Sequence, residues 1–165
     1  NEYIDEAYPP TLQPEDLLLK AKNRSWVEFS NNISLYTFQL SVKEEKNDFE
    51  RVLEELLDDF DRVEEYLWAE PFFNGKQFSL VDASYAPIFQ RLNYLEQIYK
   101  PIIEKDRYPR LTNWKDNLLS LKAVKESTVA EIQNLYYQLL WTRQGYISNY
   151  LSEKEYGKKP TKKLY

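Results

Sequence analysis

The sequence predicts an all-α domain, a bundle of about five to six helices around one buried helix. Only three of the 165 residues are Gly, whereas sheets joined by tight turns generally need more. Apolar residues recur at helical spacing through most of the chain. The stretch 78–95 is apolar at almost every turn, as expected of a helix surrounded by others. The length fits one domain with a sizeable core.

The buried helix is predicted to begin at a variant capping box formed by Ser79 and Asp82. The Ser79 hydroxyl would accept a hydrogen bond from the N–H of Asp82, and the Asp82 carboxylate would accept one from the N–H of Ser79. Glu or Gln is usual at the second position, so the shorter Asp requires a tight geometry. Pro87 falls inside this helix and is expected to bend it. We therefore assign Ser79 and Asp82 a structural role.

Two long helices are predicted before the buried one. Residues 1–13 are predicted to be the end of a preceding helix followed by an interdomain linker, because two adjacent prolines interrupt the pattern. Pro14 is typical of a first helical position, and apolar spacing continues the helix over about 14–40. After a charged turn, an apolar stripe predicts a second helix over 48–67. Two long helices joined by a short turn should pack antiparallel.

Shorter elements are predicted after these helices. An Asn-Gly pair at 74–75 marks a turn before the buried helix. Amphipathic spacing predicts two more helices over 111–121 and 129–140. The last segment, 152–165, carries five Lys with Gly and Pro and is predicted to be a flexible basic tail. The helical domain is therefore expected to span 14–151.

Net charge and hydropathy argue against two classes of partner. The chain carries 27 acidic and 22 basic residues, a formal net charge of −5. A domain with this balance is not expected to bind a phosphate backbone, so no nucleic-acid partner is predicted. No apolar run approaches the ~20 residues that span a bilayer, so no membrane partner is predicted either.

The composition also limits the chemistry. The chain contains no Cys and no His, so thiolate and imidazole catalysis are excluded within it. The acidic residues of the helix over 48–67 lie opposite its apolar stripe, which is typical of a solvated face, and we predict no metal site. No phosphate-binding glycine loop or catalytic triad motif is present. We predict no catalytic residue in this chain and a cytoplasmic location, with which the lack of Cys is compatible, although secreted proteins without disulfides also exist.

Four segments carry a resemblance to a known family. Residues 2–9, EYIDEAYP, resemble the last helix of an N-terminal thioredoxin-like domain running into a linker, and residues 20–26, KAKNRSW, resemble the first helix of the domain after it. Residues 74–87, which include the capping box, and residues 108–114, YPRLTNW, resemble two later helix starts. In this order the segments resemble the C-terminal helical domain of cytosolic glutathione transferases.

The resemblance implies a function for the complete protein. Glutathione would be the co-substrate, with no covalently bound cofactor, and the residue that activates its thiol would belong to a preceding thioredoxin-like domain. This chain would line the hydrophobic cleft for an electrophilic co-substrate and contribute to a homodimer, and it would be inactive alone. By position, Ser25, Phe29 and Asn32 are the candidates for lining that cleft. A packing role is the alternative for each of them.

Two other interpretations stay open from sequence alone. Domains of this type also serve as non-catalytic adaptors that bind other proteins. An unrelated helical bundle with a capping box is the third possibility, because a single capping box is common.

Overall fold

The computed structural model describes residues 2–67 and 71–160. Its helices are α1 (Glu2–Ala7), α2 (Leu17–Val42), α3 (Lys46–Tyr66), α4 (Leu80–Ile98), α5 (Pro109–Ser120), α6 (Lys122–Lys125), α7 (Ile132–Arg143), the 3-10 helix η1 (Tyr146–Tyr150) and α8 (Glu153–Tyr156). Over these two ranges the chain forms no strand, and a single isolated bridge pairs Phe72 with Gly75. The predicted all-α class is confirmed.

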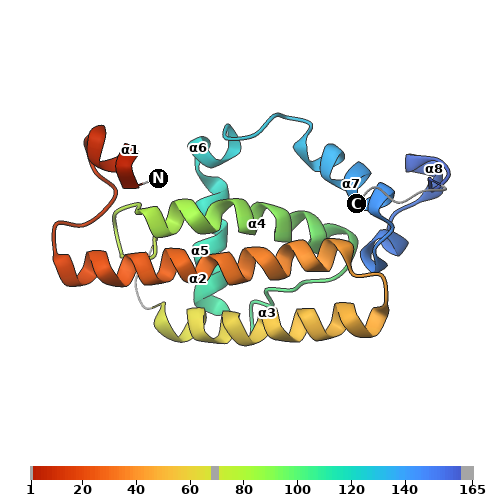
Figure 1. Cartoon of the computed structure of the whole chain (residues 1–165), viewed down its shortest axis with the longest axis horizontal. Coiled ribbons are helices and arrows are strands. Elements are labelled where there is room, and N and C mark those ends of the chain that lie inside the picture. The colour runs from red at the N-terminus through yellow and green to blue at the C-terminus, as the bar shows by residue number, and fades with distance from the viewer. Residues whose placement is uncertain (1, 68–70, 161–165) are drawn as a thin grey trace.

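Three long helices form the body of the molecule. Figure 1 shows α2, α3 and α4 side by side, with α5 crossing them and α7 at the end of the bundle where α2 finishes. α2 and α3 run antiparallel, as predicted, and α2 contacts both α3 and α4. The core therefore lies between α2, α3 and α4, and α5 packs across α3 and α4.

The first long helix begins three residues later than predicted. Asp16, not Pro14, lies at its start: the Asp16 carboxylate accepts a hydrogen bond from the N–H of Leu19 at 2.7 Å. This bond satisfies one of the N–H groups that every helix start leaves unpaired. The helix continues through Asn31 and Asn32, whose side chains are exposed. The two amides therefore remain hydrated and do not interrupt it.

The apolar stripe of α3 faces the core. Its buried members are Phe49, Val52, Leu53, Leu56, Phe60 and Val63. One acidic residue departs from the predicted solvated face: Asp59 is only 6% exposed. Burial raises the pKa of Asp59, while Arg62, 3.4 Å away, acts in the opposite direction. A single carboxylate in the stripe is thus held close to the core.

Another acidic residue of α3 caps a different helix. The Glu64 carboxylate accepts hydrogen bonds from the N–H groups of Arg110 at 3.0 Å and Leu111 at 2.7 Å, in the first turn of α5. The N-cap residue of α5, Tyr108, makes no side-chain cap bond of its own. A carboxylate at a helix start is also favoured by the helix dipole. Glu64 therefore fixes the start of α5 against α3.

The Asp82 carboxylate joins three segments of the chain. Its Oδ2 accepts from the N–H of Ser79 at 2.8 Å and from the Ser79 hydroxyl at 2.6 Å, within the capping box of α4. Its Oδ1 accepts from the N–H of Phe73 at 2.9 Å and from Nε1 of Trp114 on α5 at 2.7 Å. Asp82 is fully buried. The capping residue of α4 thus also holds the preceding loop and α5.

Both ends of the described chain pack on the bundle. The buried carboxylate of Asp5 in α1 accepts from the N–H groups of Leu12 and Gln13, at 2.6 and 3.2 Å, and so folds the linker back. In the segment predicted to be a flexible tail, the structure instead places α8, and the Lys159 ammonium lies 4.9 Å from the centre of the Trp141 ring. Packed structure therefore continues past 151 to at least Lys159, and residues 161–165 lie outside the described residues.

Replacing Asp82 by Ala should lower the free energy of unfolding by at least about 3 kcal/mol, because it leaves four buried donors without an acceptor. Ser79→Ala is the matched control and should cost only about 1 kcal/mol, since it removes one hydroxyl. Chemical denaturation measures both values. Equal losses for the two variants would contradict the role assigned to Asp82.

Candidate functional site

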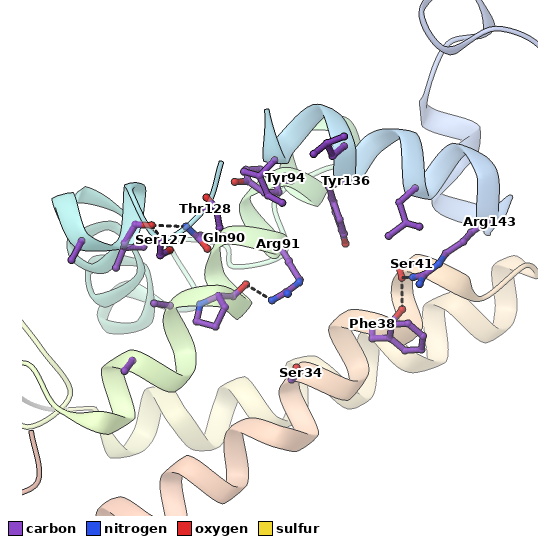
Figure 2. Close-up of a pocket in the computed structure, with 18 of the residues that line it drawn as sticks. Ser34, Phe38, Ser41, Gln90, Arg91, Tyr94, Ser127, Thr128, Tyr136 and Arg143 are labelled. Atoms are coloured by element: carbon purple, nitrogen blue, oxygen red, sulfur yellow. Dashed lines mark hydrogen bonds between the residues drawn. The ribbon is translucent and has the colours of Figure 1, made fainter. Parts of the chain in front are cut away.

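A cleft of about 880 Å³ lies on the side of α4 that faces α7. Its lining comes from α2, α4, α6 and α7 and from the segment between α6 and α7. Figure 2 shows side chains from these elements converging on one space, with α2 and α4 on one side and α7 on the other. A cavity of this size is in the range that holds a small organic ligand.

Small residues on α4 create the hollow. Ala83, Ala86 and Pro87 all line the cleft and stand three and four positions apart, so they share one face of the helix. Larger side chains there would fill the space that now separates α4 from α7. Leu135 and Leu139 of α7 close the opposite wall, and both are partly exposed. The cleft therefore has mainly apolar walls that no other described segment covers.

Two hydrogen bonds fix the spacing of α4 from α6 and from α7, the helices that form the walls of the cleft. Gln90 of α4 donates through Nε2 to the carbonyl of Val124 in α6 at 2.9 Å. The hydroxyl of Tyr137 in α7 donates to the carbonyl of Tyr94 in α4 at 2.9 Å. Both bonds satisfy polar groups beside an apolar surface, where an unpaired group would be costly. The cleft is thus part of the folded framework.

Three polar side chains define the chemistry of the cleft: Arg91 on α4, and Tyr136 and Arg143 on α7. Burial raises the pKa of Tyr136 to about 12, and the positive charges of Arg91 and Arg143 both act against that rise. Tyr136 therefore keeps its proton at neutral pH, and its hydroxyl can donate a hydrogen bond. In Figure 2 its ring points from α7 into the space between the two arginines.

Close backbone contact shuts one end of the cleft. The N–H of Tyr146 donates to the carbonyl of Lys43 at 2.6 Å, and Nη1 of Arg143 donates to the Ser41 hydroxyl at 3.3 Å. A Cβ on Gly145 would stand 2.8 Å from the carbonyl oxygen of Ser41. Gln144, with a φ of 55°, is the residue in the left-handed region at the end of α7. Gly145 is needed for the close approach of α2.

Replacing Gly145 by Ala should therefore lower the free energy of unfolding by about 1–3 kcal/mol, because the added methyl group meets rigid backbone. The same change should loosen the contact between α2 and α7 and weaken ligand binding in the cleft. Thermal unfolding and a binding titration measure the two effects. An unchanged melting temperature would show that the backbone adjusts freely.

The three residues predicted from sequence to line a cleft lie elsewhere. Ser25 and Asn32 are exposed, and Phe29 is half-buried against the edge of the Trp26 ring, at 5.3 Å between centroids. These three residues share one face of α2. Ser34, which lines the cleft, follows Ser25 by nine positions, or about two and a half helical turns, and the half turn places it on the other side of the helix. The cleft therefore borders the opposite face of α2.

Sequence reasoning missed the residues that line this cleft. Arg91, Tyr136 and Arg143 were unremarkable because their spacing along the chain says nothing of their meeting in space. The run of small residues at Ala83, Ala86 and Pro87 was the available signal.

The described residues hold neither a metal site nor a membrane-spanning helix. Among residues 2–67 and 71–160, no group of three acidic side chains is placed to hold a metal ion. Within the same residues, no helix is both long and apolar enough to cross a membrane. The capping residues Ser79 and Asp82 are buried and turned into the fold. Their role in the described residues is thus structural.

These features define an all-α domain built on a buried capped helix, with a ligand-sized cleft beside it. Residues 46–116 match the family model described as "Glutathione S-transferase, C-terminal domain". This helical domain belongs to the glutathione transferase family, as the sequence resemblance implied.

Relatives in the family agree with this assignment. The chain is 34% identical over 146 residues to glutathione S-transferase omega-1 of Rattus norvegicus, and 30% identical over 145 residues to that of Sus scrofa. Each match covers 83% of this chain and 58% of the relative, so the chain spans less than two-thirds of the relatives' length. The crystal structure of the tau class glutathione S-transferase of Mangifera indica shares the fold, with a TM-score of 0.71 at 19% identity. That match covers 84% of this chain and 67% of the mango chain.

Proposed function

We propose that this chain is the C-terminal domain of a glutathione transferase, and that the cleft beside α4 takes the apolar co-substrate. The observation that carries the proposal is the cleft itself: about 880 Å³, walled by Ala86, Pro87 and Leu139, with the polar side chains of Arg91, Tyr136 and Arg143 at its border. Ligand sites of enzymes have this composition, with apolar walls and a few polar groups that orient the ligand.

The chemistry would be attack by the glutathione thiolate on an electrophilic atom of the co-substrate. A preceding thioredoxin-like domain would bind glutathione and lower the pKa of its thiol. This chain has no Cys or His of its own, which supports that division of labour. Its part would be to hold the electrophile in position, and we propose that the isolated chain is inactive.

Exposed apolar side chains support the presence of a partner domain. Tyr3 and Ile4 on α1, and Leu17 and Leu18 at the start of α2, are all more than half exposed. Contiguous exposed apolar surface marks an interaction site in soluble proteins. We propose that the preceding domain covers this surface in a cytoplasmic protein, and that a homodimer forms through the outer faces of α2 and α3.

A non-catalytic adaptor is the second candidate function. The same exposed apolar surface would serve protein binding equally well. Activity of the complete protein separates the two.

Two faces of α2 can be compared directly for contact with the co-substrate. Phe38 lines the cleft and is half exposed, while Phe29 lies on the other face and was the residue predicted from sequence. In the complete protein, Phe38→Ala should raise KM for an apolar electrophile about tenfold, because the aromatic contact with the bound electrophile is lost. Phe29→Ala is the matched control and should leave KM unchanged. The reverse pattern would return the site to Ser25, Phe29 and Asn32.

The complete protein should be retained on immobilised glutathione and should conjugate it, because the preceding domain supplies that site. This chain alone should not bind glutathione, so titrating glutathione into it should cause no saturable change in Trp fluorescence. Saturable binding to this chain at micromolar concentrations would place the glutathione site here. If the complete protein is neither retained on immobilised glutathione nor able to conjugate it, the adaptor function is favoured.

A further inference from the structure

The cleft is positively charged although the chain as a whole is acidic. The formal net charge of the chain is −5. Arg91 and Arg143 are the charged residues among the described residues that line the cleft, and no Asp, Glu or Lys joins them there. A concentration of one sign of charge inside a cleft with apolar walls strengthens the attraction for an opposite charge.

Both arginines have unused hydrogen-bonding capacity. Arg91 donates through Nη1 to the carbonyl of Pro87 in its own helix at 3.0 Å, and Arg143 donates through Nη1 to the Ser41 hydroxyl at 3.3 Å. The Arg143 guanidinium also lies 5.1 Å from the centre of the Phe38 ring. A guanidinium has five N–H donors. Each side chain therefore keeps several donors available to a ligand.

Four other arginines are neutralised by acids. Arg24, Arg51, Arg62 and Arg107 each lie 2.7–3.4 Å from a carboxylate oxygen. Among the described ion pairs, none includes Arg91 or Arg143. Arg110 also stands outside these ion pairs, but its guanidinium donates to the carbonyls of Glu64 and Leu67 away from the cleft. Both arginines that line the cleft are therefore without a described acidic partner.

Tyr136 stands with this pair. Its ring lies 5.9 Å from that of Tyr94, and Figure 2 shows it directed from α7 into the space between Arg91 and Arg143. A neutral phenol donates a hydrogen bond but brings no charge of its own. Two guanidinium groups and one hydroxyl therefore surround a position next to the apolar wall of Ala86, Pro87 and Leu139.

We propose that the cleft selects amphipathic carboxylates: the carboxylate lies between Arg91 and Arg143 and accepts from Tyr136, and the apolar body of the ligand lies on Ala86, Pro87 and Leu139. The inference rests on the proposed use of this cleft and names the class of co-substrate that it takes. Guanidinium groups match the planar geometry of a carboxylate and form stronger hydrogen bonds with it than with neutral groups.

The test compares two probes of nearly the same shape, 1-pyrenebutyrate and 1-pyrenebutanol, by fluorescence titration of the complete protein at pH 7.5. The carboxylate is ionised at this pH and the alcohol is neutral. Pyrenebutyrate should bind about tenfold more tightly, the difference expected from charge-assisted hydrogen bonds. Glutathione, which has carboxylates but no apolar body, should not displace it.

Three variants assign the preference to the arginines. Arg91→Met should reduce the preference, and Arg91→Met with Arg143→Met should abolish it while changing pyrenebutanol affinity by no more than about twofold. Arg91 is exposed and its side chain bonds only to its own helix, so the Arg91→Met protein is expected to fold. If the double variant fails to fold, the single variant alone still decides the test. Arg51→Met, on α3 outside the cleft, is the control and should leave both affinities unchanged.

The outcomes separate the inference from the proposed function. Equal affinity for the two probes in the wild-type protein would overturn the carboxylate site and leave an apolar co-substrate cleft. A carboxylate preference that persists in the double variant would also overturn it, as would displacement by glutathione. Binding of neither probe would overturn both proposals, and would show that the preceding domain or another segment occupies the cleft.

Discussion

The hydrogen bonds to Asp82 are the interaction on which the rest of the structure depends. One fully buried carboxylate accepts from Ser79, Phe73 and Trp114, which lie at the start of α4, in the loop before it and on α5. A buried charge is tolerated only where hydrogen bonds replace its lost hydration. These donors can meet the carboxylate only when all three segments are in place. The polar site therefore specifies how the elements come together.

The aromatic cluster around Trp114 depends on that same contact. The ring of Trp114 lies 4.8–5.3 Å from those of Phe73, Tyr85 and Phe89, measured between centroids. The bond from Nε1 to Asp82 satisfies the one polar group of the indole and sets the orientation of the ring. The polar site and the apolar packing therefore support one another, and α4 is held on one side while its other side borders the cleft.

The cleft exists because α4 presents different residues on its two sides. Toward the core it carries large residues such as Phe89 and Leu92, and toward α7 it carries Ala83, Ala86 and Pro87. Protein interiors close-pack wherever side chains can reach, so an open volume beside a buried helix requires small residues and a neighbour held away from it. The bonds from Gln90 and Tyr137 provide that spacing. One face of α4 thus packs in the core and stabilises the fold, and the opposite face lines the cleft.

The sequence by itself determined the helical class, the apolar stripe of α3 and the start of α4, because each follows from spacing within a few residues. The packed end of the chain around Lys159 and the burial of Asp59 did not follow from local spacing, since both depend on neighbours distant in sequence.

Only the tertiary structure decided which residues meet at the cleft. Arg91 and Arg143 are more than fifty residues apart, and their approach requires α4 and α7 to pack in one arrangement. The face of α2 that borders the cleft was decided in the same way, by its packing on α4. Periodicity identifies the apolar face of a helix, but which neighbour covers that face is a property of the whole packed chain.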